Sequence, residues 1–391
     1  MSMTLTTDEI RETRTALADT VERFARAEIA PHASAWDEAG EFPRQLYRRA
    51  AELGLLGLGY PEALGGSGTD AQYTLRMVMT RGLCRWGTSG GVHASLLSHN
   101  IGTPPIVLLA RDDLTREVVP PILAGEAISA LGITEPGGGS DVAAIRTTAR
   151  RVADEYVVNG EKTFITSGMR ADWITLAVRT DPDARGAKGL SLLLVPGDTK
   201  GLQRVALKKM GWWASDTAHL SFDHMRVPAR CLLGEENKGF LAVMHNFNGE
   251  RFGIAAATLG FAEACYDEAL AWAQQRKTFG RSLVEHQVVR HKLVDMQQRI
   301  RATAAWLEEL AARADAGDTG ADWVGAVSML KNQATQTMHF CADEGVQILG
   351  GMGYMRGTVC ERIYREVKVL TIGGGTDEIM KELAARQWGI V

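Results

Sequence analysis

A glycine-rich segment in the first half of the chain combines a conformationally flexible backbone with polar side chains. It reads Gly132-Ile133-Thr134-Glu135-Pro136-Gly137-Gly138-Gly139-Ser140-Asp141. Glycines allow the backbone to approach a ligand closely, and their N–H groups can contact an anion or the edge of a ring. The segment is neither a P-loop nor a dinucleotide fingerprint, because no Gly-Lys-Ser/Thr follows and no βαβ unit surrounds it. Taken alone, such a loop is structural more often than it binds a ligand.

A second candidate is the basic segment Arg276-Lys277-Thr278-Phe279-Gly280-Arg281, which is followed by Glu285-His286-Gln287. Three cations with a threonine could bind a pyrophosphate, and the alternative is a solvated helix end. Three other segments are richer in Gly, Thr or Ser than packing alone requires: Phe164 to Gly168, Gln347 to Tyr354 and Ile372 to Ile379.

The elements that must position these segments follow from hydrophobic periodicity. The first 120 residues and the chain after residue 239 carry apolar residues at helical steps of three and four. The clearest helical stripes are Ile10, Leu17, Val21, Phe24; Val289, Leu293, Met296, Ile300, Thr303, Leu307, Leu310; and Val327, Leu330, Ala334, Met338, Cys341.

Between these helical regions the pattern becomes strand-like. Asn159-Gly160 stands between two strand-like runs and predicts a hairpin turn. Further strands are predicted at 173–178, 190–195 and 219–227. The fold class is therefore α+β and mostly α. We expect an N-terminal helical domain (1–124), a two-sheet or barrel-like β domain (125–237) and a C-terminal four-helix bundle (238–391).

Composition restricts the function. With 391 residues, 45% apolar content and a net charge of −4, the chain can bury more than one core and has no basic excess for general nucleic-acid binding. No apolar run approaches membrane-spanning length, and the first residues resemble neither a signal nor a transit peptide. Five scattered cysteines without metal-ligand spacing indicate reduced thiols, no metal site and a cytoplasmic location.

Taken together and in order, the segments resemble the acyl-CoA dehydrogenase family over nearly the whole chain. The most specific matches are Thr134-Glu135-Pro136 with Ser140-Asp141, Arg276 to Gly280, Gln347 to Gly351, and Gly375 to Ile379. The resemblance implies the acyl-CoA dehydrogenase fold, non-covalent FAD, and oxidation of an acyl-CoA thioester to the trans-2-enoyl-CoA, with hydride transfer from Cβ to flavin N5.

The matching positions imply three groups of FAD contacts. The flavin or the pantetheine would be bordered by Leu131, Ile133, Thr134, Gly139 and Ser140, and the isoalloxazine would lie against Phe164, Ile165 and Thr166. Many relatives have Trp where this chain has Phe164. The adenine dinucleotide half in a neighbouring subunit would be reached by Arg276, Thr278, Phe279, Gln347 and Gly351. Thr376 and Glu378 would contact FAD in their own subunit.

The catalytic base departs from the commonest family pattern. Much of the family has a Glu where this chain has Gly374. The isovaleryl-CoA and long-chain branches instead place a Glu before an Arg, which is the position of Glu250 before Arg251. The resemblance therefore implies Glu250 as the base. It also implies the Gly374 N–H as one donor to the thioester carbonyl, and Ser140, Asn248 and Arg251 as substrate contacts.

The family further implies partners and leaves two alternatives open. We expect an acyl-CoA substrate, an electron-transferring flavoprotein as acceptor, and a homo-oligomer, usually a dimer of dimers. The first alternative is a flavin oxidase or monooxygenase on the same fold, and the presence of Glu250 argues against it. The second is a non-catalytic acyl-CoA-binding protein, and the intact FAD motifs argue against that.

Overall fold

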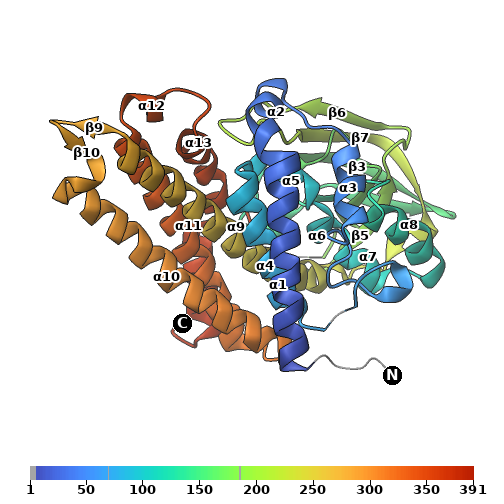
Figure 1. The fold of residues 1–391 in the computed structure, drawn as a ribbon. Coiled ribbons are helices and arrows are strands. Elements are labelled where there is room, and N and C mark those ends of the chain that lie inside the picture. The colour runs from blue at the N-terminus through green and yellow to red at the C-terminus, as the bar shows by residue number, and fades with distance from the viewer. Residues whose placement is uncertain (1–5, 69, 185) are drawn as a thin grey trace.

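The computed structural model describes residues 6–68, 70–184 and 186–391, and it divides into helices, a sheet and more helices (Figure 1). The N-terminal helices are α1 (Thr7–Phe24), α2 (Ala33–Ala39), α3 (Gln45–Glu52), α4 (Gln72–Gly87), α5 (Gly90–Leu96), α6 (His99–Gly102), α7 (Pro104–Leu109) and α8 (Asp112–Leu123). The predicted first helical stripe lies on α1, where Val21 and Phe24 are buried.

The central strands are β1 (Ser129–Gly132), β2 (Thr148–Val152), β3 (Glu155–Thr166), β4 (Trp173–Arg179), β5 (Leu190–Pro196), β6 (Leu202–Ala206), β7 (Thr217–Pro228) and β8 (Leu232–Leu233). They form one sheet in the order β6-β7-β3-β2-β4-β5-β8, with β1 parallel to β4. In the described part of the chain, its two halves pair where Thr148 of β2 meets Arg179 of β4. The expected α+β fold with a β domain between two helical regions is confirmed, but within the described residues the end strands β6 and β8 do not pair, so the β domain is one sheet that does not close into a barrel.

The predicted hairpin at Asn159-Gly160 is also wrong. Both residues lie inside β3, where the pairing with β7 shifts register, and the turn between β2 and β3 is at Ala153-Asp154 instead. Gly160 has φ 141°, and a Cβ there would lie 2.7 Å from the Thr147 Cα. The Asn-Gly pair therefore belongs to a β-bulge, and this particular bulge needs a glycine because of its φ and the close approach of Thr147.

The C-terminal region consists of α9 (Gly239–Gln275), α10 (Gln287–Asp315), α11 (Ala321–Leu349), α12 (Gly351–Tyr354), α13 (Val359–Ile372) and α14 (Asp377–Gln387), with a small hairpin of β9 (Lys277–Thr278) and β10 (Arg281–Ser282) between α9 and α10. The two predicted stripes lie on α10 and α11. The long helices pack as a bundle, and α4 of the N-terminal region packs on α9. No helix of the described residues is long and apolar enough to cross a bilayer.

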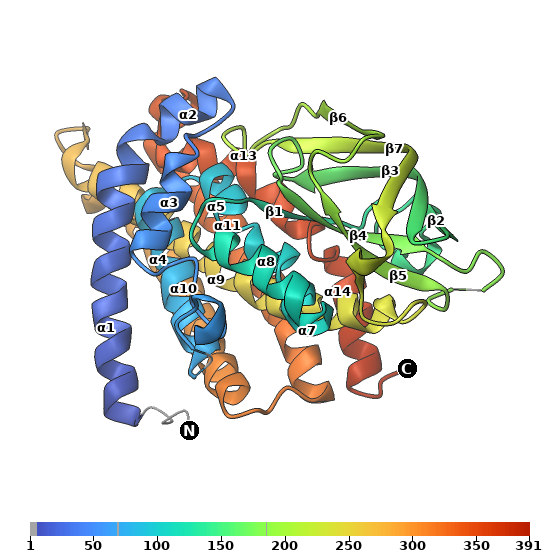
Figure 2. The ribbon, with the colours of Figure 1, turned by 90° about the vertical axis from the view of Figure 1, so that its right-hand side faces the viewer.

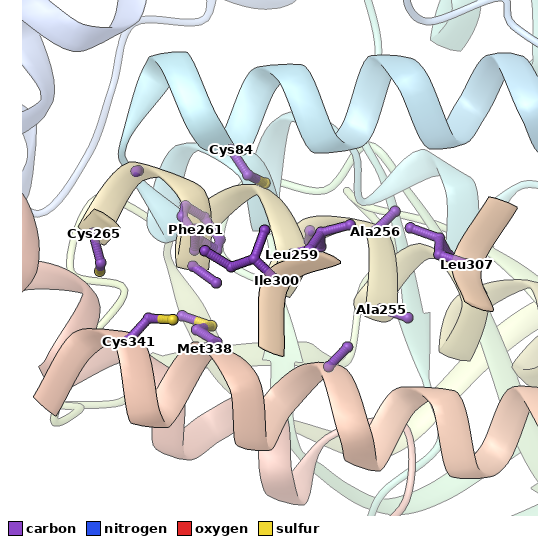
Figure 3. Packing of buried hydrophobic residues seen from close by; sticks show 14 of the residues in the cluster. Cys84, Ala255, Ala256, Leu259, Phe261, Cys265, Ile300, Leu307, Met338 and Cys341 are labelled. Carbon is purple, nitrogen blue, oxygen red and sulfur yellow. The ribbon is translucent and has the colours of Figure 1, made fainter. Parts of the chain in front are cut away.

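The largest core lies where α9 is enclosed on several sides. Figure 3 shows Phe261 and Leu259 of α9 between Cys84 of α4, Ile300 of α10 and Met338 of α11. All five cysteines are free and buried, as expected from the sequence. Because α9 is buried from residue 255 to residue 265, the helix is fixed by packing directly after the turn that carries Glu250 and Arg251.

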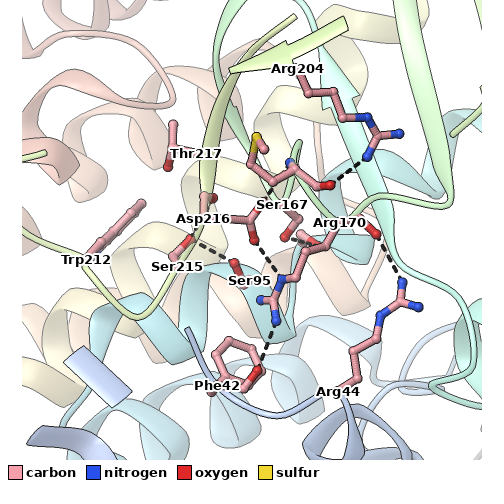
Figure 4. A network of polar contacts seen from close by, with 12 residues as sticks. Phe42, Arg44, Ser95, Ser167, Arg170, Arg204, Trp212, Ser215, Asp216 and Thr217 are labelled. Carbon is pink, nitrogen blue, oxygen red and sulfur yellow. Dashed lines mark hydrogen bonds and ion pairs between the residues drawn. The ribbon is translucent and has the colours of Figure 1, made fainter. Parts of the chain in front are cut away.

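The N-terminal helices lie beside the sheet (Figure 2), and polar contacts fasten them to it (Figure 4). Arg170, just after β3, donates to Asp216 at 2.9 Å and to the Phe42 carbonyl at 3.0 Å. Ser95 of α5 and Ser215 share a buried hydrogen bond of 2.8 Å. The sheet and both helical regions are thus locked together around the surfaces that carry the candidate site.

Candidate active site

The centre of the site is Glu250, which lies on α9 beside the turn between α13 and α14. The turn consists of Gly373, Gly374 and Gly375. A Cβ built on Gly374 would lie 3.9 Å from the Glu250 Oε1 and only 2.6 Å from the Ile254 Cδ1. Glu250 and the glycine turn therefore face each other, although they are more than a hundred residues apart in the sequence.

The glycine turn cannot easily accept a side chain at its centre. Gly374 has φ 68° and Gly375 has φ 108°, which are conformations that L side chains rarely adopt. The steric limit from Ile254 adds to this restriction. A glutamate at position 374 would thus be strained here.

Arg251, the next residue on α9, braces the turn. Its Nε donates to the Gly374 carbonyl at 3.1 Å, and its Nη1 donates to the Asn248 Oδ1 at 2.9 Å. Arg251 is buried, and its guanidinium lies 5.8 Å from the centre of the Phe247 ring. Two of the three residues expected to contact substrate, Asn248 and Arg251, are therefore brought together next to Glu250 and bonded to each other.

The surroundings of Glu250 make it a stronger base than an exposed glutamate. Burial raises the pKa of Glu250 to about 6, against the opposing charges of Arg251 and Lys331. A carboxylate with this pKa is still mostly ionised at neutral pH, yet accepts a proton more readily than usual. The site can therefore remove a weakly acidic proton.

The glycine-rich segment after β1 lies against the end of β3. Thr163 of β3 donates its N–H to the Thr134 carbonyl at 2.9 Å, and Lys162 donates to the Ile133 carbonyl at 2.9 Å and to Glu135 at 2.8 Å. Lys162 is completely buried, and burial lowers its pKa to about 8, against the charge of Glu135. This ion pair fixes the start of the loop, while its glycine end, including Gly139 and Ser140, stays exposed.

Phe164 projects from the end of β3 at a second bulge. The register with β7 shifts between Lys162 and Ile165, and Phe164 has φ 61° with 68% of its surface exposed. Its neighbour Ile165 is buried, and Thr166 is half-buried. A strained backbone that presents an exposed aromatic ring beside an open glycine loop is suited to one face of a planar ring system.

Thr376 and Glu378 lie at the start of α14, directly after the glycine turn. The Thr376 hydroxyl accepts a hydrogen bond from the Ile379 N–H at 3.3 Å, which makes it the N-cap of α14. Glu378 is exposed in the first turn of the helix. Both residues therefore share a surface with the turn, and the hydroxyl of Thr376 also has a structural task.

The remaining residues that we expect to contact FAD lie away from Glu250 within one chain. Thr278 and Phe279 belong to the β9–β10 hairpin and Arg276 directly precedes it, and this hairpin lies at the opposite end of the bundle from the sheet (Figure 1). Phe279 at its tip is 96% exposed and has φ 51°. Gln347 and Gly351, near the end of α11, are also exposed. The β9–β10 hairpin therefore presents the Phe279 ring to the surroundings of the chain rather than to its core.

One residue near the site has no place in the sequence expectations. Lys331 of α11 is completely buried, and its Nζ donates to the Gly375 carbonyl at 2.8 Å. A usable signal was present, because an ionisable residue stands inside the apolar stripe between Leu330 and Ala334. Charged residues are almost never fully buried unless they are paired, so such a position calls for a buried partner.

Comparisons with known proteins agree along the whole chain. Residues 11–126 match the sequence profile described as acyl-CoA dehydrogenase, N-terminal domain, residues 130–225 match the middle domain, and residues 237–389 match the C-terminal domain. The mouse mitochondrial long-chain specific acyl-CoA dehydrogenase is 37% identical over 371 residues, which are 94% of this chain and 85% of that protein.

Two further relatives extend the comparison. Cyclohexane-1-carbonyl-CoA dehydrogenase of Geobacter metallireducens is 35% identical and spans 98% of both chains. The crystal structure of a probable acyl-CoA dehydrogenase from Mycobacterium abscessus is 46% identical, with a TM-score of 0.92, and covers 96% of this chain and 98% of that one.

Proposed function

The chain belongs to the acyl-CoA dehydrogenase family, a family of FAD-dependent oxidoreductases, and on that premise we propose that it converts an acyl-CoA thioester to the trans-2-enoyl-CoA with Glu250 as the α-proton base. The observation that carries this proposal is the pairing of a half-buried glutamate with a glycine turn that has no side chain of its own. Glu250 of α9 is the carboxylate that faces Gly374.

The proposed chemistry divides between two groups of this chain. The Glu250 carboxylate takes the proton from Cα, which breaks that C–H bond and moves negative charge onto the thioester oxygen. The Gly374 N–H donates to that oxygen, and such preorganised donors are worth several kcal/mol in the transition state. FAD, when bound, supplies N5 as the acceptor for the hydride that leaves Cβ.

The residues present fit FAD. Phe164 offers an exposed ring, and a Cβ at Gly137 or Gly138 would meet nothing within 4 Å, so the loop backbone is open to a ligand. In this proposal Leu131, Ile133, Thr134, Gly139, Ser140, Phe164, Ile165, Thr166, Thr376 and Glu378 hold the cofactor in their own subunit. The residues of the β9–β10 hairpin, with Gln347 and Gly351, complete the FAD site of a neighbouring copy.

The proposal extends to partners and organisation. Asn248, Arg251 and Ser140 contact the acyl-CoA, and an electron-transferring flavoprotein reoxidises the reduced enzyme. The exposed Phe279, on a hairpin that follows the far end of α9 from Glu250, supports an obligate oligomer, which in this proposal is a tetramer built as a dimer of dimers. The domains implied by this organisation are 1–124, 125–237 and 238–391.

The test is anaerobic mixing of the purified yellow protein with butyryl-, isovaleryl- and palmitoyl-CoA. We expect at least one to bleach the flavin absorbance with formation of an enoyl-CoA, and air alone to restore the colour slowly. Rapid reoxidation with a hydroxylated product would show a monooxygenase instead. A colourless protein that cannot be reconstituted with FAD would show a non-catalytic acyl-CoA-binding protein.

A further inference from the structure

The two central carbonyls of the glycine turn are held by two different helices. Arg251 of α9 donates to the Gly374 carbonyl at 3.1 Å, and Lys331 of α11 donates to the Gly375 carbonyl at 2.8 Å. Gly374 and Gly375 both have positive φ and carry no side chain that could pack. Because glycine has more conformational freedom than any other residue, the turn depends on these cations for a single conformation.

Lys331 is buried between the glycine turn and the start of α14. Its side chain is completely buried, and its Nζ lies 3.7 Å from the Asp377 Oδ1 at the start of α14. Its neighbour Asn332 donates to the Asp377 carbonyl at 2.9 Å. Two successive residues of α11 therefore fix both sides of Thr376, so the turn and the start of α14 are held against the bundle as one unit.

We propose that Lys331 is a positioning residue for α-proton abstraction, which holds the Gly375 carbonyl and thereby aims the Gly374 N–H at the thioester oxygen beside Glu250. The inference rests on the proposed function of Glu250 and Gly374. Lys331 itself touches neither substrate nor the reacting atoms. It acts through the turn, as a side chain that supports a preorganised donor should.

The charge of Lys331 gives this role a signature that a purely structural lysine would lack. The charged groups around it are Glu250 and Arg251 on α9 and Asp377 on α14. Burial lowers the pKa of Lys331 to about 8, against the charge of Asp377, so the ammonium form persists at neutral pH. Lys331 in turn opposes the burial that raises the pKa of Glu250. Loss of the charge should therefore move the ionisation of Glu250 to higher pH.

The experiment compares Lys331→Met, Lys331→Arg and wild type by the anaerobic rate of flavin bleaching across pH, with an acyl-CoA that bleaches wild type. We expect Lys331→Met to lower the maximal rate by about 10–100-fold, since misplacement of one carbonyl donor has effects of this order. The acid limb of its pH–rate profile should lie at higher pH. The acyl-CoA concentration that gives half the maximal rate should change by less than about threefold. Lys331→Arg should return the acid limb toward wild type.

The matched control is Ser328→Ala, one turn earlier on α11, because the Ser328 hydroxyl is buried and bonds only within its helix, to the Val324 carbonyl. It should leave both rate and acid limb unchanged. If Lys331→Met does not fold, Lys331→Gln replaces it in the test. The Gln amide can donate a hydrogen bond but carries no charge, so this variant should also move the acid limb to higher pH.

A wild-type rate and acid limb in Lys331→Met would overturn the inference. So would a slower rate with an unmoved acid limb and weaker acyl-CoA binding, which is the pattern of general loosening. Failure of the proposed function looks different, because then no acyl-CoA would bleach the wild-type flavin.

Discussion

Glycine at position 374 is the residue on which the site depends most closely. Because its Cβ would lie 2.6 Å from the Ile254 Cδ1, and because φ is 68°, the position excludes a side chain sterically and conformationally. The same exclusion means that a side-chain base cannot easily stand on this turn, which supports our proposal that the base is Glu250 of α9.

Gly374→Ala should therefore damage both stability and chemistry. A left-handed conformation costs a non-glycine residue about 1–2 kcal/mol, and displacement of the turn should slow flavin bleaching at least about tenfold. Thermal unfolding and anaerobic bleaching measure the two effects. In the double variant with Ile254→Val, which lacks the Cδ1 atom, part of the loss should return. A Gly374→Ala protein with wild-type stability and rate would contradict the described turn.

Sequence reasoning at the residue scale named Glu250 and Gly374 but missed Lys331. Glu250 could be found because the glutamate that much of the family has at position 374 is replaced by glycine here, and comparison with the family pattern reveals that replacement. Lys331 contacts only a backbone carbonyl in the turn, Gly375, and no side-chain motif encodes that contact. Its one sequence signal is a charge inside the stripe Val327, Leu330, Ala334.

Among the elements, the end of β3 carries the clearest functional distortion. The bulge between Lys162 and Ile165 turns the Phe164 ring outward, 68% exposed, where an undistorted strand would alternate inward and outward side chains. The open glycine loop is tied to the same strand end through Thr163 and Thr134. One strand end therefore positions both the ring and the loop that we assign to FAD.

Phe164→Ala should weaken FAD binding without weakening the fold. Loss of an aromatic contact worth about 1–2 kcal/mol corresponds to roughly a tenfold rise in the FAD dissociation constant. Titration of the apoprotein with FAD, followed by flavin fluorescence, measures this change. Val205→Ala, which removes an exposed apolar side chain on β6 of the same sheet, is the control and should bind FAD normally. Equal affinities for both variants would rule out a flavin contact at Phe164.

Strands and long helices were predictable because their periodicity is strong. The runs at 173–178, 190–195 and 219–227 became β4, β5 and β7 with ends shifted by one or two residues. The hairpin prediction at Asn159-Gly160 was wrong because a glycine that accepts an unusual backbone conformation suits either a hairpin turn or a β-bulge. The side-chain amide of Asn159 instead accepts the His224 N–H at 2.9 Å, a long-range contact with no local signal.

At the scale of the whole molecule, a buried charge cluster joins both ends of the chain. Glu366 of α13 is completely buried and accepts the Gly90 N–H at 3.0 Å, while its Oε1 has no partner within the described part of the chain. Burial and the nearby Asp37 raise the pKa of Glu366 to about 7, against the charges of Arg362 and Arg365. Helices α2, α5 and α13 meet at this carboxylate.

The cluster predicts a pH-dependent stability. A folded pKa of about 7 exceeds the unfolded value of 4.5, so the stabilising contribution of Glu366 is fully present below pH 4.5 and is lost as pH rises through 7. Glu366→Gln keeps an acceptor for Gly90 but cannot ionise. It should raise the melting temperature at pH 8 and have less effect at pH 5, with a difference in unfolding free energy on the order of 3 kcal/mol at most.

Thermal melts of Glu366→Gln at both pH values measure the difference. Glu382→Gln, which breaks an exposed ion pair with Arg386, is the control and should show no such pH dependence. An equal shift of the melting temperature at pH 5 and pH 8 would contradict a Glu366 that ionises near neutrality.

Glu250 is the residue that we propose to take the α proton. Single-turnover flavin bleaching in Glu250→Gln tests this role most directly. In wild type the rate should rise with pH through about 6, as Glu250 ionises. Glu250→Gln should bind FAD normally but bleach at least ~10² more slowly at every pH, the effect of losing a general base. Glu268→Gln, further along α9 where the carboxylate accepts the Val359 and Cys360 N–H groups, should keep the wild-type profile. A Glu250→Gln rate within about threefold of wild type would show that the base lies elsewhere.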